Sequence, residues 1–424
     1  MKQMTKRERV NATLNHQTPD RLPIDVGATT QTGIHASTMY KLRKALGLEE
    51  HPIEIQEIYQ MLGKMDDDLC KVLETDVVCL QRLSNQLGGT YKNFKPWKMF
   101  DGTPVMMPGD FEYTTNAKGD ILSFPGGDRT APPSCIMPKD GCFFDNIFRS
   151  ETEFDEDDMH PREDYADDFQ VMTDEEARYL EKESKRLWEE TDYAVFGNLI
   201  GLGMGDMSWV AAPHIAHPKG IRNSTEFLEA QLMYPEYLEE VFDLQTEVML
   251  KNLEIYKQAV GERICAVYIS GTDLGTQNGP FMSLNTFREL YKPRYKRVND
   301  WVHQNTNWKT WYHSCGSVVA FMDDFIDMGM DCLNPIQTSA AGMDPVLLKE
   351  KYGDKLVFWG GGIQTQTTLN NGTPQDCIDE VKRNIDIFGK DGGFVFCTCH
   401  NIVANMPIDN IVATFETALG HKLR

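Results

Sequence analysis

Short apolar segments alternate with helical segments along the chain, and this alternation constrains the fold more than any other feature. The predicted strands are residues 22–25, 76–80, 193–198, 264–270, 310–313, 332–334, 356–359 and 394–397. The predicted helices are residues 5–15, 37–46, 66–73, 173–190, 235–259, 284–305, 318–328, 345–352 and 373–388. Strands separated by helices form parallel sheets, because each helix carries the chain back along one face of the sheet. Eight such strands predict an α/β fold of the (β/α)8 type, the TIM barrel.

One long segment interrupts the alternation after the second predicted strand. Between about residues 88 and 170, short alternating segments are separated by glycine and proline, which is typical of antiparallel strands. We predict an inserted β-meander here, within a single elaborated barrel domain over residues 1–424. Phe143, Phe144 and Asp145 of this insertion could turn back over the barrel mouth as a lid. The helix after the insertion should begin with a capping box, in which Thr173 and Glu176 satisfy the first backbone groups.

Charge and composition exclude several classes of partner. The chain has 424 residues, with 42 lysines and arginines against 64 acidic residues, so its formal net charge is −22. Nucleic acids and anionic membranes need a concentrated basic face, and no such run occurs here. No apolar span approaches the ~20 residues of a membrane helix, and we expect a cytoplasmic protein. Ten cysteines without regular spacing favour free thiols and a metal site over a disulfide framework.

Two clusters of metal-binding residue types lie at predicted strand ends. The segment WKTWYHSCG places His313 and Cys315 at the end of the fifth strand, and GGFVFCTCH places Cys397, Cys399 and His400 at the end of the eighth. Alternate residues of an extended segment point the same way, so His313 and Cys315 can both reach one ion. In barrels, chemistry lies at the carboxyl ends of the strands, where the two clusters would meet.

Other polar residues also follow predicted strands and would face the same mouth. We take Asp273 as a candidate acid or orienting carboxylate; a turn-capping aspartate is the alternative. The candidate substrate-binding residues are Asn198, Gln277, Asn334 and Gln337, although each could instead satisfy backbone groups at a strand end.

Several strings in the second half of the chain resemble the uroporphyrinogen decarboxylase superfamily. They are HSCGSV, LNPIQTSAAGMDP, FWGGGIQTQTTLNNGTP and GGFVFCTCHNI followed by NMPIDNI, together with DLGTQNGPFMS. The resemblance covers most of the chain and is strongest from about residue 267. It implies a barrel fold and either of two activities, because the superfamily contains both decarboxylases and zinc-dependent methyltransferases that work with corrinoid proteins.

A departure from the decarboxylase pattern favours the methyltransferase branch. Uroporphyrinogen decarboxylases are expected to carry an arginine-rich R-Q-A-G-R motif that holds the substrate carboxylates. The corresponding residues 26–31 read VGATTQ and contain no arginine. A substrate with eight carboxylates would be poorly bound without that motif in so acidic a protein.

The resemblance also implies the ligands of a zinc ion. Thiol-using methyltransferases of the superfamily hold zinc through His-x-Cys and one distant cysteine, and His313 and Cys315 match the first pair. His400 occupies the position of the distant cysteine, while Cys399 and Cys397 lie one and three residues before it. Either Cys399 or His400 would complete a three-ligand site with an open position. In the alternative without a metal, Cys397 and Cys399 are small buried residues and His313 is a hydrogen-bonded histidine.

The predicted reaction moves a methyl group between a small methylated compound, such as a methoxylated one, and the cobalt of a corrinoid. The chain lacks the cobalamin-binding pattern D-x-H-x-x-G, so methylcobalamin or cob(I)alamin would arrive on a separate corrinoid protein. The aromatic insertion resembles the substrate-demethylating component, an O-demethylase, more than the thiol-methylating one. The alternatives are a methylcobalamin:thiol methyltransferase, a decarboxylase of a carboxylated small molecule and a non-catalytic binding barrel.

Overall fold

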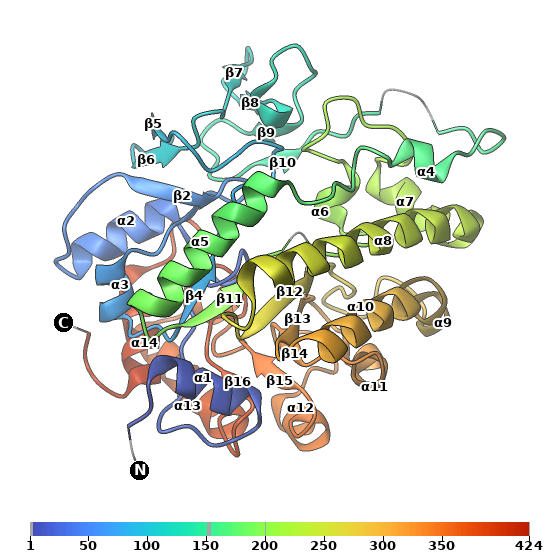
Figure 1. Cartoon of the computed structure of the whole chain (residues 1–424). Coiled ribbons are helices and arrows are strands. Elements are labelled where there is room, and N and C mark those ends of the chain that lie inside the picture. Colours follow the sequence, from blue (N-terminus) through green and yellow to red (C-terminus); the bar gives the residue numbers. More distant parts are fainter. Residues whose placement is uncertain (1–2, 151–153, 200, 424) are drawn as a thin grey trace.

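A curled parallel sheet forms the centre of the computed structural model, which describes residues 3–150, 154–199 and 201–423 (Figure 1). Within these residues the sheet has seven strands, all of which follow predicted segments. In their order across the sheet they are β16 (Phe394–Val395), β15 (Val357–Trp359), β14 (Cys332–Asn334), β13 (Lys309–His313), β12 (Ala266–Ser270), β11 (Ala194–Gly197) and β4 (Val77–Leu80).

The first predicted strand, residues 22–25, is reduced to a single bridge between Ile24 and Phe396. The backbone N–H of Asp25 donates to the carbonyl of Phe396, and the N–H of Asp76 donates to the carbonyl of Ile24. This segment therefore joins both edges of the sheet, beside β16 and β4. It is too short to form a ladder, and Pro23 has no N–H to donate. The curled parallel sheet agrees with the predicted barrel, while the eighth strand is shorter than predicted.

Helices cover the outer face of the curled sheet and match the predicted segments closely (Figure 1). They are α1 (Lys6–Leu14), α2 (Ala36–Ala45), α3 (Asp67–Val72), α5 (Asp174–Glu190), α8 (Pro235–Val260), α9 (Leu284–Thr286), α10 (Lys292–Asn305), α11 (Met322–Asp327), α12 (Pro345–Tyr352) and α13 (Pro374–Phe388). Helices and helical turns without a predicted counterpart are α4 (Pro161–Asp164), α6 (Met207–Val210), α7 (Ser224–Met233), α14 (Ile408–Leu419) and η1 (Pro125–Gly127). Two further helical turns, η2 (Phe287–Tyr291) and η3 (Val319–Phe321), lie within predicted helices. The turn η4 (Thr365–Leu369) precedes the predicted helix of residues 373–388 and has no predicted counterpart.

Helix α5 begins as predicted but without the full capping box. The Thr173 hydroxyl accepts the N–H of Glu176 at 3.2 Å. The Glu176 carboxylate turns away instead and accepts the N–H groups of Leu83 and Ser84 at 2.8 and 3.0 Å. It therefore ties the loop after β4 to α5, and a tertiary contact replaces the local one.

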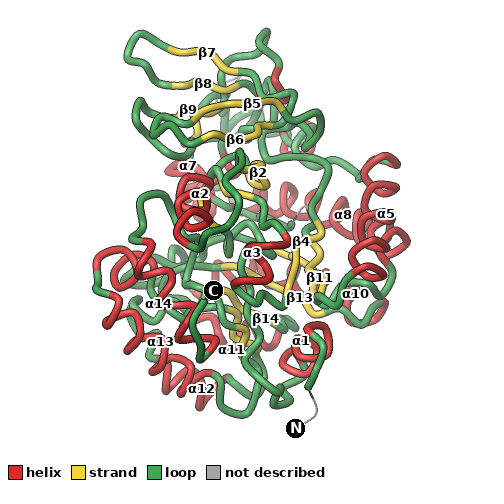
Figure 2. Tube along the Cα trace, turned by 90° about the vertical axis from the view of Figure 1, so that its left-hand side faces the viewer, coloured by secondary structure: helices red, strands yellow, loops and turns green. Residues whose placement is uncertain are grey.

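The inserted segment contributes strands to two small sheets above the barrel, as Figure 2 shows at the upper end of the molecule. Strands β7 (Tyr113–Thr115), β8 (Ile121–Ser123), β9 (Cys135–Met137) and β10 (Asp145–Asn146) pair antiparallel in the order β10-β9-β8-β7. Strands β5 (Lys95–Lys98) and β6 (Pro104–Met107) instead join β1 (Ile34–His35), β2 (Ile53–Glu57) and β3 (Leu62–Gly63). The insertion is therefore not one self-contained meander, because earlier residues supply three strands of the second sheet. Residues 151–153 of the insertion lie outside the described residues.

Aromatic side chains fill the inside of the barrel. Phe196, Trp311 and Trp359 meet with ring centroids 5.3 to 6.4 Å apart and in edge-to-face orientations. Each ring buries roughly 150–250 Å², which corresponds to about 4–6 kcal/mol of apolar burial per side chain. The interior is a packed core, so open space for a ligand must lie beyond the carboxyl ends of the strands.

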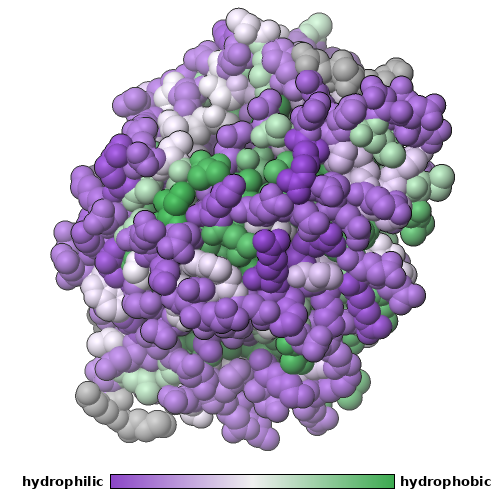
Figure 3. All heavy atoms as spheres, turned by 45° about the vertical axis from the view of Figure 1, so that its right-hand side comes forward, coloured by the Kyte–Doolittle hydropathy of each residue, from purple (hydrophilic) through white to green (hydrophobic). Residues whose placement is uncertain are grey.

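The outer surface is mostly hydrophilic. Figure 3 shows one face on which hydrophilic residues surround a central patch of apolar ones. Among the helices that the structure describes, none is both long and apolar enough to cross a membrane. The ten cysteines are free thiols.

Candidate metal centre and cavity

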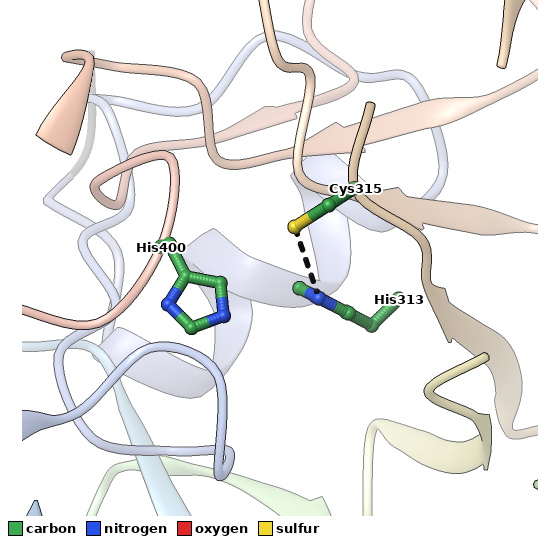
Figure 4. A group of neighbouring side chains, drawn as sticks. All are labelled: His313, Cys315 and His400. Atoms are coloured by element: carbon green, nitrogen blue, oxygen red, sulfur yellow. Dashed lines mark hydrogen bonds between the residues drawn. The ribbon is translucent and has the colours of Figure 1, made fainter. Parts of the chain in front are cut away.

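The carboxyl ends of β13 and β16 bring two histidines and one cysteine together. His313 ends β13, and its Nε2 lies 3.4 Å from the Sγ of Cys315. His400 follows β16 and faces this pair (Figure 4). One ligand atom from each of the three residues lies within 4.8 Å of the other two. We call His313, Cys315 and His400 the donor cluster.

The turn that carries Cys315 is fixed by three side chains. The N–H of Cys315 donates to Asp273 Oδ1 at 2.6 Å, and the N–H of Gly316 donates to Gln337 Oε1 at 2.7 Å. The Oγ of Ser314 accepts the N–H of Leu274 at 2.8 Å. These hydrogen bonds to backbone groups around the thiol hold it at the barrel rim.

His313 is 4% exposed, and its second ring nitrogen also has a partner. Its Nδ1 lies 2.6 Å from Oδ1 of Asn334. Strands β13 and β14 place His313 and Asn334 directly opposite each other in register, so the contact follows from the strand pairing. The ring therefore faces the donor cluster with Nε2.

Burial sets the protonation of the donor cluster. It lowers the pKa of both His313 and His400 to about 4, so both rings are neutral at neutral pH. Burial raises the pKa of Cys315 well above its ordinary value, and the nearby carboxylate of Asp273 adds to that effect. The cluster thus offers two neutral imidazoles as ligands. Its thiol would lose its proton only when a cation binds there.

These donors fit a zinc ion. Zinc bonds of ~2.3 Å to sulfur and ~2.0–2.1 Å to nitrogen, at the tetrahedral angle, put neighbouring donors roughly 3.6 Å apart. The sulfur and nitrogen of Cys315 and His313 are 3.4 Å apart. Three protein donors beside a cavity are the arrangement of catalytic rather than structural zinc sites.

Of the two candidates for the third ligand, the described structure groups His400 with His313 and Cys315, and not Cys399. Cys399 is buried, its N–H donates to the carbonyl of Ile363, and its thiol lies beside Gln364. Cys397 belongs to the hydrophobic core inside the barrel. Neighbouring residues in this turn point to different sides, which explains why only His400 reaches the cluster.

Asp273, the candidate acid, lies beside the donor cluster. Its Oδ1 is 3.6 Å from Nε2 of His313. The side chain is 45% exposed because it faces a cavity, yet protein surrounds it closely enough that desolvation raises the pKa of the carboxyl.

The four candidate substrate-binding residues have different positions. Asn198 lines the cavity, but its amide donates to the carbonyl of Ala28 and to the sulfur of Cys79. Asn334 and Gln337 are buried and support His313 and Gly316 rather than line the cavity.

Gln277 does not lie in the cavity wall. Its side chain is exposed, and its Nε2 donates to Gln366 Oε1. The loop after β12 continues outward beyond Asp273, and this direction carries Gln277 away from the mouth.

A cavity of about 740 Å³ lies above the donor cluster. Its wall includes His313, His400 and Asp273, together with Phe143, Phe144 and Asp145 of the insertion. The N–H of Phe144 donates to the carbonyl of Tyr59 at 2.8 Å, which fixes that segment to the wall. The insertion therefore contributes directly to the space in which a ligand would bind.

Sequence reasoning missed three acidic residues of the wall, namely Asp168, which pairs with Arg222, together with Glu57 and Asp206. Glu57 is 2% exposed and accepts the N–H groups of Tyr59 and Gln60, and burial raises its pKa to about 7. Burial also raises the pKa of Asp206 to about 7, with Asp273 nearby. Asp206 ends the segment GLGMGD, which follows β11 at its carboxyl end, so it could have been found. Glu57 lies at the end of β2 in a small sheet, and no motif marks it.

Comparison with known proteins gives one family and one fold. Residues 190–421, just over half the chain, match the family model described as uroporphyrinogen decarboxylase (URO-D). The solved structure of a methyltransferase from Methanosarcina mazei is similar over 98% of this chain and 99% of that one, with a TM-score of 0.55 and 16% sequence identity. No curated protein sequence matches this chain.

Proposed function

The chain belongs to the uroporphyrinogen decarboxylase family, and from that premise we propose that it is a zinc-dependent methyltransferase. It would move a methyl group between a small methylated compound and the cobalt of a separate corrinoid protein. The observation that carries the proposal is the donor cluster, two of whose residues, His313 and His400, line the cavity in which a ligand would bind. The Methanosarcina mazei methyltransferase supports it only through the shared fold.

The residues of the site would divide the work as follows. His313, Cys315 and His400 would hold the metal. Zinc bound there supplies a Lewis acid that polarises an oxygen or nitrogen of a methyl donor, or lowers the pKa of a thiol. Asp273 uses Oδ1 to bind the N–H of Cys315, which leaves Oδ2 to hold or release a proton at the heteroatom of the substrate.

The charge of the cavity wall opposes the activity after which the family is named. Among the described lining residues the basic ones are Arg82 and Arg222, and Arg222 is already paired with Asp168 at 2.6 Å. The acidic lining residues are Glu57, Asp145, Asp168, Asp206 and Asp273. A substrate with many carboxylates would be repelled here, so decarboxylation of such a substrate is the weaker candidate.

The size and lining of the cavity favour a small methoxylated substrate, as in an O-demethylase. Its volume of about 740 Å³ lies within the range of roughly 300–1,000 Å³ for small-molecule sites. Aromatic side chains of Phe143, Trp209 and Tyr268 face it, and these suit a flat organic body.

The corrinoid would reach the site from a separate protein that docks at the cavity mouth. Phe143 and Val403 line the cavity and remain 46% and 42% exposed. Exposed apolar side chains at the rim of a ligand cavity are common in binding surfaces.

Metal content tests the proposal directly. We expect about one zinc per purified wild-type chain, because the three donors form a single site, and none in Cys315→Ala. Cys399→Ala is the matched control, because Cys399 neighbours His400 without belonging to the donor cluster. Wild type free of metal, or Cys315→Ala with a full complement, would overturn the zinc site.

Turnover then separates the candidate reactions. Wild type should demethylate a methoxylated aromatic compound only when cob(I)alamin or a corrinoid protein is present. Methyl transfer from methylcobalamin to a thiol would instead identify the thiol methyltransferase. Release of carbon dioxide without cobalamin would identify a decarboxylase.

A further inference from the structure

Asn334 occupies a position from which it can control the donor cluster without belonging to it. It ends β14, one strand away from His313, and it is completely buried. Its two amide atoms have different partners. Oδ1 lies 2.6 Å from His313 Nδ1, and Nδ2 donates to the carbonyl of Trp359 at 2.7 Å.

The carbonyl of Trp359 determines the orientation of this amide. A carbonyl oxygen only accepts hydrogen bonds, so the NH2 group of Asn334 must face it. The amide oxygen then faces His313, and an amide oxygen also only accepts. Nδ1 of His313 must therefore carry the hydrogen, because two acceptors at 2.6 Å would repel each other.

We infer that Asn334 is a positioning residue that fixes His313 in the Nδ1–H tautomer and so presents the Nε2 lone pair to the metal. A neutral imidazole carries one N–H, so hydrogen at Nδ1 leaves Nε2 as the free acceptor. Nε2 is the atom that lies 3.4 Å from Cys315 Sγ. The inference rests on the proposed zinc site and replaces the substrate-binding role predicted for Asn334.

Gly360 provides the space for this arrangement. Its backbone has a φ of +96°, and a Cβ there would lie 3.0 Å from Asn334 Nδ2 and 2.8 Å from Cys397 Sγ. A side chain at position 360 would therefore push the amide away from Trp359. Trp359, whose carbonyl binds the amide, ends β15. The ends of three neighbouring strands, β13, β14 and β15, therefore determine the orientation of the His313 ring.

The tautomer can be measured in the metal-free full-length protein. With nitrogen-15-labelled histidine, a long-range correlation spectrum should show His313 protonated at Nδ1 and bare at Nε2, with the signal assigned from a His313→Asn variant. Asn334→Leu should lose this preference. Asn334→Asp should keep it, because a buried carboxyl that is protonated on the oxygen facing the Trp359 carbonyl still accepts from His313 Nδ1 with its other oxygen. Wild-type His313 protonated at Nε2 would overturn the inference, whether or not any variant folds.

Zinc affinity, measured by competition with a chelating dye, gives a second readout. Loss of an outer partner of a metal-bound histidine typically weakens binding by about 10- to 100-fold, and we expect that loss in Asn334→Leu. Asn334→Asp should bind zinc nearly as tightly as wild type. Undiminished zinc affinity in Asn334→Leu would overturn the inference.

Asn299→Leu is the matched control. Asn299 is equally buried, its Nδ2 donates to the carbonyl of Met328, and its Oδ1 accepts from the hydroxyl of Tyr312. Neither partner belongs to the donor cluster, so this variant should lose stability but keep zinc affinity. If wild type binds no zinc at all, the proposed function fails, while the tautomer measurement still decides the role of Asn334.

Discussion

Asp20 shows how a single ionised side chain supports the closure of the barrel. Its two oxygens accept from Nε and Nη2 of Arg9 at 2.7 and 3.0 Å, and Nη1 of Arg9 donates to Asp76 at 2.6 Å. Asp76 in turn accepts the N–H of Ile24 at 2.8 Å. The chain of contacts therefore links helix α1 to the segment that joins the two edges of the sheet.

The pH dependence of Asp20 follows from this contact. Hydrogen bonding to Arg9 lowers the pKa of Asp20 from 3.8 to about 2 in the folded state. A carboxyl group whose pKa is lower in the folded state stabilises the fold at pH values above its unfolded-state pKa. This stabilisation is lost as the pH falls through the folded-state pKa of about 2. We expect Asp20→Asn to reduce the free energy of unfolding by about 2 kcal/mol at pH 7. Chemical denaturation should show the difference narrowing between about pH 4 and pH 2.

Asp300→Asn serves as the comparison for that measurement. Asp300 forms an exposed pair with Lys296 one helical turn away, so the change should cost only about 0.3–0.5 kcal/mol. Equal losses of unfolding free energy in the two variants would show that the pairing of Asp20 with Arg9 stabilises the fold no more than an exposed ion pair does.

At the residue scale, metal ligands could be predicted from the sequence where the spacing of two residues along the chain determines how their side chains point. His313 and Cys315 alternate along one extended segment, so their convergence could be predicted. The choice between Cys399 and His400 depends on the direction of a turn, which is not periodic. Gln277 could not be placed for the same reason, since it lies in a loop whose course depends on contacts with Gln366 and the backbone of Ala341.

At the scale of elements, the loops after β12 and β13 pack closely against each other next to the donor cluster. Gly316 has a φ of +85°, and a Cβ there would lie 2.3 Å from the carbonyl oxygen of Gly275 and 2.7 Å from that of Thr276. The loops after β12 and β13 can approach this closely only because glycines occupy their contact. The position of Cys315 therefore depends on backbone packing between two neighbouring strands.

Gly316→Ala should displace the turn that carries Cys315. We expect a loss of stability above the ~1 kcal/mol that a positive φ alone costs alanine, and zinc affinity reduced on the order of tenfold. Thermal unfolding and dye competition would measure both effects. Gly420→Ala separates the two causes, since Gly420 has a φ of +77° but no atom within 4 Å of a built Cβ. Equal effects of the two substitutions on stability would contradict the packing argument.

The elements themselves divide into predictable and unpredictable ones. Buried parallel strands read as continuous apolar runs, and β4, β11 and β12 were predictable for that reason. The small sheet that holds β2 was not, because β1 and β3 have only two residues each and β2 pairs with β6, about 50 residues further along the chain. Strand β5 reads KPWK, and the proline argues against a strand anywhere but at a sheet edge, which is where it lies.

At the scale of the whole molecule, charge distinguishes the candidate substrates. The net charge of the chain is −22, and the described cavity wall contains five acidic side chains but only two arginines. Salt screens the outer charges over about 8 Å at physiological ionic strength, but it screens the cavity less. One uncompensated carboxylate about 8 Å from a ligand anion costs roughly 2 kcal/mol at an effective dielectric constant of about 20. The cavity should therefore select against anions that otherwise resemble the substrate.

A matched pair of ligands tests that selection. Para-methoxyphenethyl alcohol and para-methoxyphenylacetate have similar shapes and differ in charge, and calorimetry should find the neutral compound bound at least about tenfold more tightly. At about pH 8, above the pKa of about 7 that burial gives Asp206, Asp206→Asn should raise the affinity of the anion and leave that of the alcohol unchanged, because only the anion is repelled by the removed charge. Tighter binding of the carboxylate by wild type would show that Arg82 and Arg222 dominate the cavity. It would also make a carboxylated substrate, and therefore decarboxylation, the better supported hypothesis.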